Sequence, residues 1–229
     1  MRVLLVGHGR LGRAIETLAA ASAVDLAGVL DEDSIAGGRA LDPARWPGVD
    51  VIIDASTADA FVQNVPGLVR LGANLVVGTT GWQAHEPAVR EAVEHAGLGI
   101  VVAANFSIGA VVLQEVASRA AGLLVPHTDY AAWVHEAHHA AKRDAPSGTA
   151  RQLVQAMSAA GYDRPVDVSS TRAGFIPGTH TVGFEGRFDS LALTHTVRDR
   201  AVFAEGALAA ARWVIGRRGW FTMRDVLGL

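Results

Sequence analysis

The chain has 229 residues, of which 50% are hydrophobic and 19% are charged, and its formal net charge at pH 7 is −3. This length is enough for one large domain or two modest domains with a hydrophobic core. The slightly negative charge argues against a general nucleic-acid-binding surface, and the lack of cysteine excludes disulfide bonds and thiolate chemistry.

Targeting signals are also missing from the sequence. The apolar run at the N-terminus, MRVLLVG, is too short for a signal peptide. The apolar stretch over residues 107–125 is broken by Gln114, Glu115 and Arg119 and does not qualify as a membrane span. We therefore expect a cytoplasmic protein that has no membrane partner.

The first part of the chain alternates strand-like and helix-like segments. Continuous apolar runs, which are typical of buried parallel strands, cover Val3–Val6, Leu26–Leu30, Val51–Ile53, Leu75–Val77 and Ile100–Ala103. Helical patterns follow the first, third and fourth of these, the last over Gln83–His95, whereas the glycine-rich stretch Asp33–Pro47 predicts a loop. Such alternation predicts an α/β fold with a doubly wound parallel sheet of the Rossmann type.

A glycine-rich loop joins the first strand to the first helix. It reads Gly7-His8-Gly9-Arg10-Leu11-Gly12. GxGxxG in this context is the dinucleotide-binding fingerprint, because the glycines permit a tight turn and let the backbone approach a pyrophosphate; the alternative is a plain glycine turn. About 20 residues later the second strand ends in Asp31 and Glu32, where an acid would bind the adenosine ribose hydroxyls unless it is merely solvated. Gly78, Thr79 and Thr80 follow the fourth strand, at the edge where open α/β sheets bind ligands.

The sequence changes in character after a long helix that ends at Leu124. Strand-like stretches cover Tyr130–Glu136, Asp167–Thr171, His180–Glu185 and Leu191–Val197, with one helix between the first two. We expect a smaller α+β domain with a mixed or antiparallel sheet, one face of which serves subunit contact. An apolar helix over Ala204–Ile215 and an apolar tail over Trp220–Leu227, which we expect to dock, complete the chain.

One segment, His135–Ala150 (HEAHHAAKRDAPSGTA), gathers groups that carry protons and groups that bind anions. The turn Pro146–Thr149 is typical of the start of a helix, whose free amides the serine and threonine hydroxyls can bond. Unpaired amides and the positive end of the helix dipole form a receptor for a carboxylate. We expect His138, His139 and Lys142 to lie on the loop before this helix. The segment then predicts a site for an acidic small molecule that is protonated during its reaction.

Other interpretations of the histidines stay open. A histidine is more often structural or solvated than catalytic, and adjacent histidines in a strand would point to opposite faces. A zinc site is disfavoured because HHxxK lacks the usual ligand spacing and the chain has no cysteine. We therefore expect no metal.

Together these motifs resemble the 4-hydroxy-tetrahydrodipicolinate reductase family, also called dihydrodipicolinate reductases, of bacterial lysine biosynthesis. The resemblance covers nearly the whole chain and rests on GHGRLG, VVGTTGW, AANFSIGA, EAHHAAKRDAPSGTA, RAGFIPGTHTVGFEG, FAEGALAAARWV and MRDVL. The block E-x-HH-x-x-K-x-D-x-PSGTA is highly specific.

The resemblance implies an oxidoreductase with two domains. Residues 1–106 and 202–229 would form the dinucleotide-binding Rossmann domain, and residues 107–201 would bind substrate and build a homotetramer. NADH or NADPH would pass a hydride to a cyclic imine dicarboxylate and give tetrahydrodipicolinate, a step in diaminopimelate and lysine biosynthesis.

The resemblance also assigns site residues, motif by motif. His138 and Lys142 would be the acid–base pair. The substrate contacts would be His139, Ser147, Gly148, Thr149, Arg172 and His180, with Gly148 and Thr149 holding a carboxylate. The cofactor contacts would be Gly7, His8, Gly9, Arg10, Leu11, Gly12, Asp31, Glu32, Gly78, Thr79, Thr80, Ala103, Ala104, Asn105 and Phe106.

The chain departs from the usual family pattern at three places. The glycine loop is one residue shorter than the usual GxxGxxG, and the segment Gly161–Ser170 is also short. Where relatives have an acid followed by a basic residue, this chain has Asp31 followed by Glu32 and a further acid. These carboxylates would repel a 2′-phosphate, an effect softened by Arg10 and Arg13, and by Arg39 if its loop folds back. We therefore expect a preference for NADH without exclusion of NADPH.

Two rival functions belong to other classes. One is another nicotinamide enzyme of similar layout, such as an amino-acid or imine dehydrogenase, against which the His–His–Lys block argues. The other is a non-catalytic nucleotide sensor, which would need neither that block nor an anion site.

Overall fold

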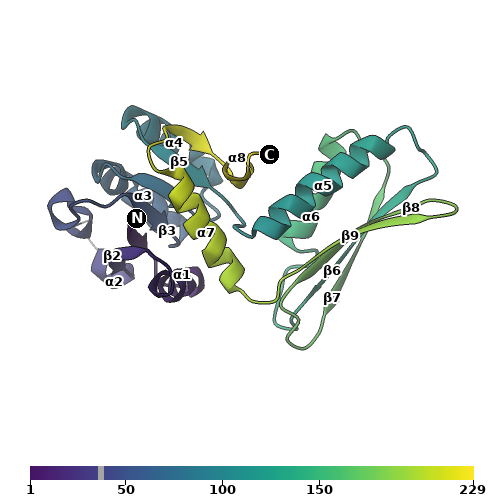
Figure 1. Ribbon diagram of the computed structural model, residues 1–229, viewed down its shortest axis with the longest axis horizontal. Helices are drawn as coiled ribbons and strands as arrows, with labels where there is room; N and C mark the ends of the chain where they lie inside the picture. Colours follow the sequence, from purple (N-terminus) through teal and green to yellow (C-terminus); the bar gives the residue numbers. More distant parts are fainter. Residues whose placement is uncertain (36–38) are drawn as a thin grey trace. The chain divides into compact units, whose positions relative to one another are not determined.

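The computed structural model describes residues 1–35 and 39–229, and the chain divides into two compact units. The first unit comprises Met1–Ser107 and Ala201–Leu229, and the second comprises Ile108–Arg200. Each unit contains its own sheet, with six strands in the first and four in the second among the residues described (Figure 1).

The sheet of the first unit is parallel and has the strand order β10-β5-β4-β3-β1-β2. Its strands are β1 (Arg2–Val6), β2 (Asp25–Leu30), β3 (Val51–Asp54), β4 (Asn74–Val77), β5 (Gly99–Val102) and β10 (Gly219–Phe221). Strand β2 lies on one side of β1 and β3 on the other, so the chain crosses over β1 between them. The topological switch point, where such sheets bind ligands, therefore lies between β1 and β3. The doubly wound parallel sheet predicted from the sequence is confirmed.

Helices pack on both faces of this sheet. They are α1 (Arg10–Ala20), α3 (Ala58–Arg70), α4 (Glu86–His95) and α7 (Ala201–Val214), with the short helices α2 (Glu32–Ile35) and α8 (Met223–Leu227). One face contributes Leu4, Ile52 and Leu75 to a core with Phe61 of α3 and Val93 of α4. The other face is covered by α1 and α7, which also contact each other. No helix in the described part of the chain is long and apolar enough to cross a membrane.

Several segment boundaries differ from the sequence prediction. Gln83–His95 is a 3₁₀ turn over Gln83–His85 followed by α4. The predicted loop Asp33–Pro47 contains the end of α2 and two 3₁₀ turns, Arg39–Leu41 and Pro43–Arg45, the second capped by Asp42; residues 36–38 lie outside the described residues.

The C-terminal segment also differs in detail. The last long helix begins at Ala201 and ends at Val214, earlier than predicted at both ends. The apolar tail adds the edge strand β10 to the sheet beside β5, and Thr222 then caps α8 through a capping box with Asp225. A three-residue strand is too short to show a period, so the sequence predicted only that the tail would dock.

The second unit has a mixed sheet with the order β7-β6-β8-β9. Its strands are β6 (Ala131–His138), β7 (Val166–Arg172), β8 (Thr179–Glu185) and β9 (Ser190–Thr196); β6 and β7 are parallel and the other pairs antiparallel. Helices α5 (Ile108–Leu124) and α6 (Gly148–Ala159) lie side by side on one face of this sheet (Figure 1). The core between helices and sheet is built from Leu113, Leu153, Met157, Val134, Val182 and Phe184.

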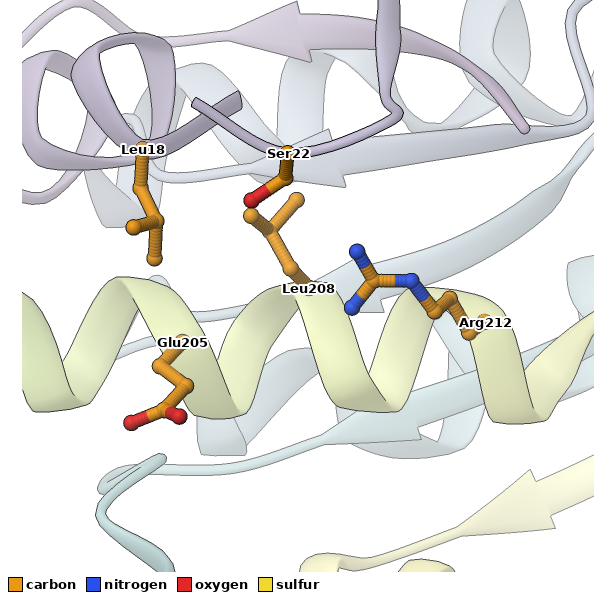
Figure 2. Close-up of a pocket in the computed structure, with 5 residues that line it drawn as sticks. All are labelled: Leu18, Ser22, Glu205, Leu208 and Arg212. Atoms are coloured by element: carbon orange, nitrogen blue, oxygen red, sulfur yellow. The ribbon is translucent and has the colours of Figure 1, made fainter. Parts of the chain in front are cut away.

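A pocket of about 340 Å³ lies in the first unit between α1 and α7. Leu18, Ser22, Glu205, Leu208 and Arg212 line it (Figure 2). These residues belong to none of the segments that the sequence singled out for binding or chemistry. The pocket is therefore not the predicted functional site.

Candidate functional site

The glycine loop between β1 and α1 has the geometry of a pyrophosphate-binding turn. Gly7 has φ of +95°, and a Cβ there would lie 2.5 Å from the Ala55 backbone. A Cβ on Gly12 would lie 2.1 Å from Gly7 O, whereas a Cβ on Gly9 would meet nothing within 4 Å. The outer glycines thus permit the tight turn and the close helix packing, and Gly9 leaves space for a ligand to approach the backbone. The shortened loop therefore fits a dinucleotide.

Asp31 lies beside this loop, because Gly7 N donates a 2.7 Å hydrogen bond to Leu30 O. Its Oδ1 accepts hydrogen bonds from the Ser34 hydroxyl at 2.6 Å and the Ser34 backbone N at 2.9 Å. These bonds hold the pKa of Asp31 below its ordinary value. Glu32 follows as the first residue of α2 and is exposed. The predicted ribose-binding acids therefore adjoin the glycine loop.

Thr79 faces the protein interior rather than a ligand space. Its hydroxyl donates a 2.6 Å hydrogen bond to Oδ1 of Asp54, and its carbonyl accepts one from Trp82 Nε1 at 2.7 Å. Asp54 is fully buried at the end of β3, and its Oδ1 also accepts from the Ser56 hydroxyl at 2.8 Å. Burial raises the pKa of Asp54, against the effect of these hydrogen bonds. Asp54 thus joins the loops that follow β3 and β4.

The ends of β4 and β5 contact the start of α1. A Cβ on Gly78 would lie 2.9 Å from Leu11 Cδ2 and 3.0 Å from Phe106 Cε2. The remaining predicted cofactor residues at these strand ends are Thr80, Ala103, Ala104 and Asn105. The structure therefore brings the glycine loop and both strand ends to one edge of the sheet, beside the switch point.

The second unit holds the histidines and the lysine. Strand β6 continues to His138, two residues farther than predicted, because its pairing with β7 continues to Arg172. His138 is therefore the last residue of a strand and not part of a loop, whereas His139 and Lys142 do lie in the loop that follows. Strand alternation places His138 on the same face as Glu136, two residues earlier.

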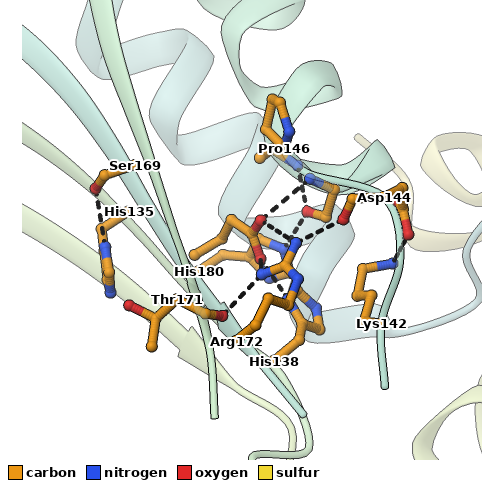
Figure 3. Close-up of polar contacts among 12 residues, drawn as sticks. His135, His138, Lys142, Asp144, Pro146, Ser169, Thr171, Arg172 and His180 are labelled. Carbon is orange, nitrogen blue, oxygen red and sulfur yellow. Dashed lines mark hydrogen bonds and ion pairs between the residues drawn. The ribbon is translucent and has the colours of Figure 1, made fainter. Parts of the chain in front are cut away.

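The carboxylate of Glu136 forms the centre of the site. The side chain is 0% exposed, and Arg172 donates two hydrogen bonds to it, from Nη2 to Oε1 at 2.6 Å and from Nη1 to Oε2 at 2.9 Å. His138 Nδ1 bonds to Oε2, and the backbone N of Ser147 donates to Oε1 at 3.2 Å. One buried carboxylate thus joins the end of β6, the end of β7 and the start of α6. Figure 3 shows two of its partners, His138 and Arg172, close together.

The two terminal nitrogens of Arg172 are fully engaged within this cluster, whereas its buried Nε has no hydrogen-bond partner in the described part of the chain. Besides Glu136, its Nη1 bonds Thr171 O at 2.8 Å and its Nη2 bonds Asp144 O at 2.6 Å. Each terminal nitrogen of a guanidinium carries two hydrogens, so all four are in use. A direct contact between these terminal nitrogens and a substrate carboxylate, as expected from the sequence, would require some of these bonds to break. The structure instead makes Arg172 the group that holds Glu136 and the loop before α6.

The pKa values of Glu136 and His138 are set by burial and by neighbouring charges. Burial acts to raise the pKa of Glu136, but hydrogen bonds from Arg172, Ser170 and His138 outweigh it and lower the pKa to about 2. Burial lowers the pKa of His138; Glu136 opposes this, while the charges of Lys142 and Arg172 add to it. At neutral pH Glu136 is therefore a fixed negative charge beside a histidine whose neutral form is favoured by burial.

The predicted helix start is present at α6. Ser147 is the N-cap, and its hydroxyl accepts a 3.2 Å hydrogen bond from Ala150 N. Gly148 and Thr149 occupy the first turn, where helical geometry leaves backbone amides without a helical partner. His180, 6% exposed, lies with Nε2 3.0 Å from Ser147 Oγ. The helix start is therefore fixed by the sheet below it.

Lys142 and the loop around it are also held in place. Lys142 Nζ donates to Asp144 Oδ1 at 2.7 Å, a bond that lowers the pKa of Asp144. The loop is tied to the segment after β7, because Ala173 N donates to His138 O and Ala140 N to Gly174 O, at 3.0 and 3.1 Å. The ammonium group and the imidazole therefore adjoin the same helix start.

Three of these side chains have ligand atoms within 4.8 Å of one another, namely Glu136, His138 and His180. A cation there would have to displace the Arg172 guanidinium, which bonds both oxygens of Glu136. It would also compete with Nδ1 of His138 for the same carboxylate. The cluster therefore fits proton transfer better than metal binding.

Sequence reasoning missed Glu136, Ser170 and Asp54. A signal for Glu136 was present, since Glu136 and His138 are separated by two residues in a strand and must share a face. Its pairing with Arg172, 36 residues later, depends on the parallel pairing of β6 and β7, which no local pattern reveals. Asp54 lies in the segment Asp54–Thr57, which the sequence predicts to cap the following helix; Thr57 is the N-cap of α3, whereas Asp54 bonds Thr79 and Ser56.

Comparison with known proteins covers both units. The family model described as dihydrodipicolinate reductase, N-terminus, matches residues 1–106, and the one described as dihydrodipicolinate reductase, C-terminus, matches residues 109–227. A 4-hydroxy-tetrahydrodipicolinate reductase of Methanoregula boonei is 35% identical, with 100% of this chain and 98% of the relative covered. One of Christiangramia forsetii is 33% identical, with 99% and 98% covered.

A solved structure shares the fold of the whole chain. It is the dipicolinate-bound dihydrodipicolinate reductase of Paenisporosarcina sp. TG-14, with a TM-score of 0.83, 22% sequence identity and 98% of each chain covered. At this identity the likeness establishes the fold alone. It confirms the expected combination of a Rossmann-type parallel sheet and a smaller mixed-sheet unit.

Proposed function

The chain belongs to the dihydrodipicolinate reductase family, and from that premise we propose how its residues reduce 4-hydroxy-tetrahydrodipicolinate to tetrahydrodipicolinate in lysine biosynthesis. The observation that carries the proposal is the shared carboxylate of Glu136, which holds a proton-carrying histidine and an anion-binding helix start in one cluster. A cyclic dicarboxylate that accepts a proton needs both groups. Neither rival function, a nucleotide sensor or an amino-acid dehydrogenase, accounts for this combination.

His138 and Lys142 are the proposed acid–base pair. When bound, reduced nicotinamide supplies a hydride to the substrate. A proton must follow the added electron pair, and His138 or Lys142 delivers it. The side chain of His138 is only 12% exposed and that of Lys142 24% exposed, so both groups are shielded from bulk water while remaining accessible. General acids of this kind typically contribute about 10²–10⁴-fold to the rate.

The start of α6 is the proposed carboxylate site. The amides of Gly148 and Thr149 and the Thr149 hydroxyl would bind one carboxylate, with His139 contributing from the loop. The cap that Ser147 and His180 form supports this turn from below. An anion at a helix N-terminus is favoured both by the amides and by the dipole.

The first unit is the proposed site of the nicotinamide nucleotide. The glycine loop would receive the pyrophosphate, and Asp31 the ribose hydroxyls, with Gly78, Thr80 and the segment Ala103–Phe106 on the nicotinamide side. We propose that NADH is preferred over NADPH, because Glu32 and its acidic neighbours adjoin the ribose position. The role of residues 1–106 and 202–229 as a nucleotide domain is part of this proposal.

The second unit is also the proposed assembly surface of a homotetramer. The face of its sheet opposite α5 and α6 carries pairs of hydroxyl side chains, Thr179 with Thr196 and Thr181 with Thr194, at 3.2 and 3.0 Å. Small side chains of this kind allow two sheets to approach closely. The cytoplasmic location expected from the sequence stays a prediction.

The test generates the unstable substrate in place, from pyruvate and aspartate semialdehyde with the synthase that condenses them. We expect loss of NADH absorbance only when both substrates and the synthase are present. A sensor would bind NADH without oxidising it in this mixture. An amino-acid dehydrogenase would oxidise NADH with a 2-oxo acid and ammonia instead. Either of these two results would contradict the proposal.

A further inference from the structure

We propose that Glu136 is a positioning residue for the proton transfer and that Arg172 balances its charge. The Glu136 carboxylate accepts a hydrogen bond from Nδ1–H of His138, which leaves Nε2 as the nitrogen that exchanges a proton with the substrate. The inference rests on the proposed function, since that function makes His138 a proton donor. In this proposal Arg172 balances the charge of Glu136 and is not a substrate ligand.

The tautomer of His138 follows from the charge of its neighbour. Glu136 is ionised at neutral pH, with a pKa of about 2, and an ionised carboxylate can only accept hydrogen bonds. The nitrogen of His138 that contacts it, Nδ1, must therefore carry a hydrogen. In the neutral ring Nε2 is then the bare nitrogen, and in the charged ring Nε2–H is the proton available for donation.

A glycine lies against the Nε2 edge of the His138 ring. A Cβ on Gly178 would lie 3.3 Å from both Nε2 and Cδ2 of the ring. Gly178 has φ of +143°, a conformation that other residues rarely adopt, so the backbone itself favours glycine here. The nitrogen assigned to proton exchange therefore faces a position at which the chain has no side chain.

The proton transfer from His138 to the substrate accounts for every bond and electron pair. The imidazolium form of His138 breaks its Nε2–H bond and gives that proton to the substrate atom that becomes negative when the hydride adds. The electron pair of that bond stays on Nε2, and Nδ1–H stays bonded to Glu136. Water or Lys142 then returns a proton to Nε2 and restores the imidazolium.

Four charged or titratable groups face His138, one from each neighbouring element. Glu136 of β6 favours the imidazolium, while Lys142 of the loop and Arg172 of β7 act against it. His180 of β8 lies with its ring centroid 5.0 Å from that of His138 and is neutral, since its pKa is about 4. Because Glu136 and Arg172 act in opposite directions, removing each charge has an opposite effect on the affinity of His138 for its proton. General damage to the site would not produce shifts of opposite sign.

The experiment measures the protonation of His138 in the full-length protein. Ring ¹⁵N and ¹³C NMR, assigned with His138→Gln, follows the titration in wild type, Glu136→Gln and Arg172→Gln. We expect the pKa of His138 to fall by about one unit in Glu136→Gln and to rise in Arg172→Gln. The ¹⁵N shifts of the neutral ring should show the hydrogen on Nδ1 in wild type. The descending limb of kcat/KM against pH should move in the same two directions.

Ser169→Ala is the matched control. It removes the hydroxyl that bonds His135 Nδ1 at 2.9 Å, in the same strand pair but away from the cluster (Figure 3). It should leave the titration of His138 unchanged. If Glu136→Gln does not fold, two other variants test the proposal. The pKa of His138 should rise in Arg172→Gln. It should return toward the wild-type value in the doubly neutral variant Glu136→Gln/Arg172→Gln.

Shifts of equal sign, or no shift in any variant, would overturn the assignment of Glu136 and Arg172. A wild-type enzyme that shows the expected NMR shifts but does not reduce the imine substrate would instead contradict the proposed function. The two failures are therefore distinguishable.

Discussion

Ser147 Oγ and His180 Nε2 lie 3.0 Å apart, so the N-cap of α6 rests on a buried histidine of β8. Burial, with a contribution from the charge of His138, lowers the pKa of His180 from 6.5 to about 4. The folded protein thus holds this histidine neutral where an unfolded chain would bind a proton. The start of α6 is therefore coupled to pH.

We predict that this coupling destabilises the protein in mild acid. Between pH 6.5 and about 4 the unfolded state binds more protons at His180 than the folded state, so stability falls as pH falls through this window. The effect is on the order of 2–3 kcal/mol. Urea unfolding at pH 7 and pH 4.5 measures it. Glu136 stays ionised over this window, since its pKa is about 2.

His180→Asn provides the control for this prediction. It removes the titrating ring and keeps a polar side chain beside Ser147. In this variant the difference in unfolding free energy between pH 7 and pH 4.5 should be smaller than in wild type by most of the expected effect of about 2–3 kcal/mol. If His180→Asn kept the full pH dependence of the wild type, groups other than His180 would cause the loss of stability in mild acid.

Removal of either proposed acid–base group should slow the reaction without weakening NADH binding. We expect His138→Ala and Lys142→Ala to lower kcat by about 10²–10⁴-fold. Both residues belong to the unit Ile108–Arg200, whereas the glycine loop belongs to the other unit, so NADH affinity by fluorescence titration should change little. Arg143→Ala, which removes an exposed cation next to Lys142, is the control and should keep near wild-type kcat. Near wild-type kcat in both test variants would show that the catalytic assignment is wrong.

Pyridine-2,6-dicarboxylate, a flat dicarboxylate resembling the product, should inhibit competitively with the imine substrate. Thr149→Val should weaken its binding by a charge-assisted hydrogen bond, about 1.5–3 kcal/mol or roughly 10- to 150-fold in Kd. Thr149→Ser keeps the hydroxyl and should bind nearly as well as wild type. Titration calorimetry compares the three proteins. Equal affinities throughout would place the carboxylate site away from the start of α6.

Assembly should depend on the open face of the second sheet. Light scattering at micromolar concentration should give a mass four times that of one chain. Thr181→Glu places a charge in the middle of that face, on the inner strand β8, and should lower the mass. Thr17→Glu on α1, in the other unit, is the control and should not. A stable wild-type monomer would contradict the proposal.

The sequence predicted the layout of this site better than its internal bonding. Glycine spacing, apolar strands and the PSGT turn are local patterns, and each appears in the structure near its predicted position. His138 was placed in a loop because strand propensity fades after Glu136, yet the pairing with β7 carries the strand onward. Tertiary pairing overrides a weak local preference here.

Arg172 illustrates what local patterns cannot show. Its bonds to Glu136 and to Asp144 O join segments 36 and 28 residues away. An arginine within a site motif is equally compatible with a substrate ligand and with an internal partner. Only the geometry shows that the terminal hydrogens of Arg172 are already in use. Thr79 of the first unit is similar, because it was expected to bind a ligand and its hydroxyl instead bonds Asp54.

The last prediction concerns the choice between NADH and NADPH. The 2′-phosphate of NADPH would lie near Asp31, which is held beside the glycine loop and kept ionised by Ser34. Glu32 and the acid after it begin α2 and are exposed. Like charges at contact distance cost about 1 kcal/mol even in water, which corresponds to a factor of about five in kcat/KM. Arg10 and Arg13, exposed on α1, offset part of this repulsion.

Glu32→Arg should therefore raise kcat/KM for NADPH and leave the value for NADH less affected. Glu91→Arg, on the exposed surface of α4, changes the net charge by the same amount and is the control. Because the repulsion is electrostatic, the preference for NADH should narrow as salt is added, since exposed charges are screened over about 10 Å at 0.1 M ionic strength. If the wild-type enzyme used NADPH better than NADH at the same ionic strength, the arginines would outweigh the acids and the predicted preference would be wrong.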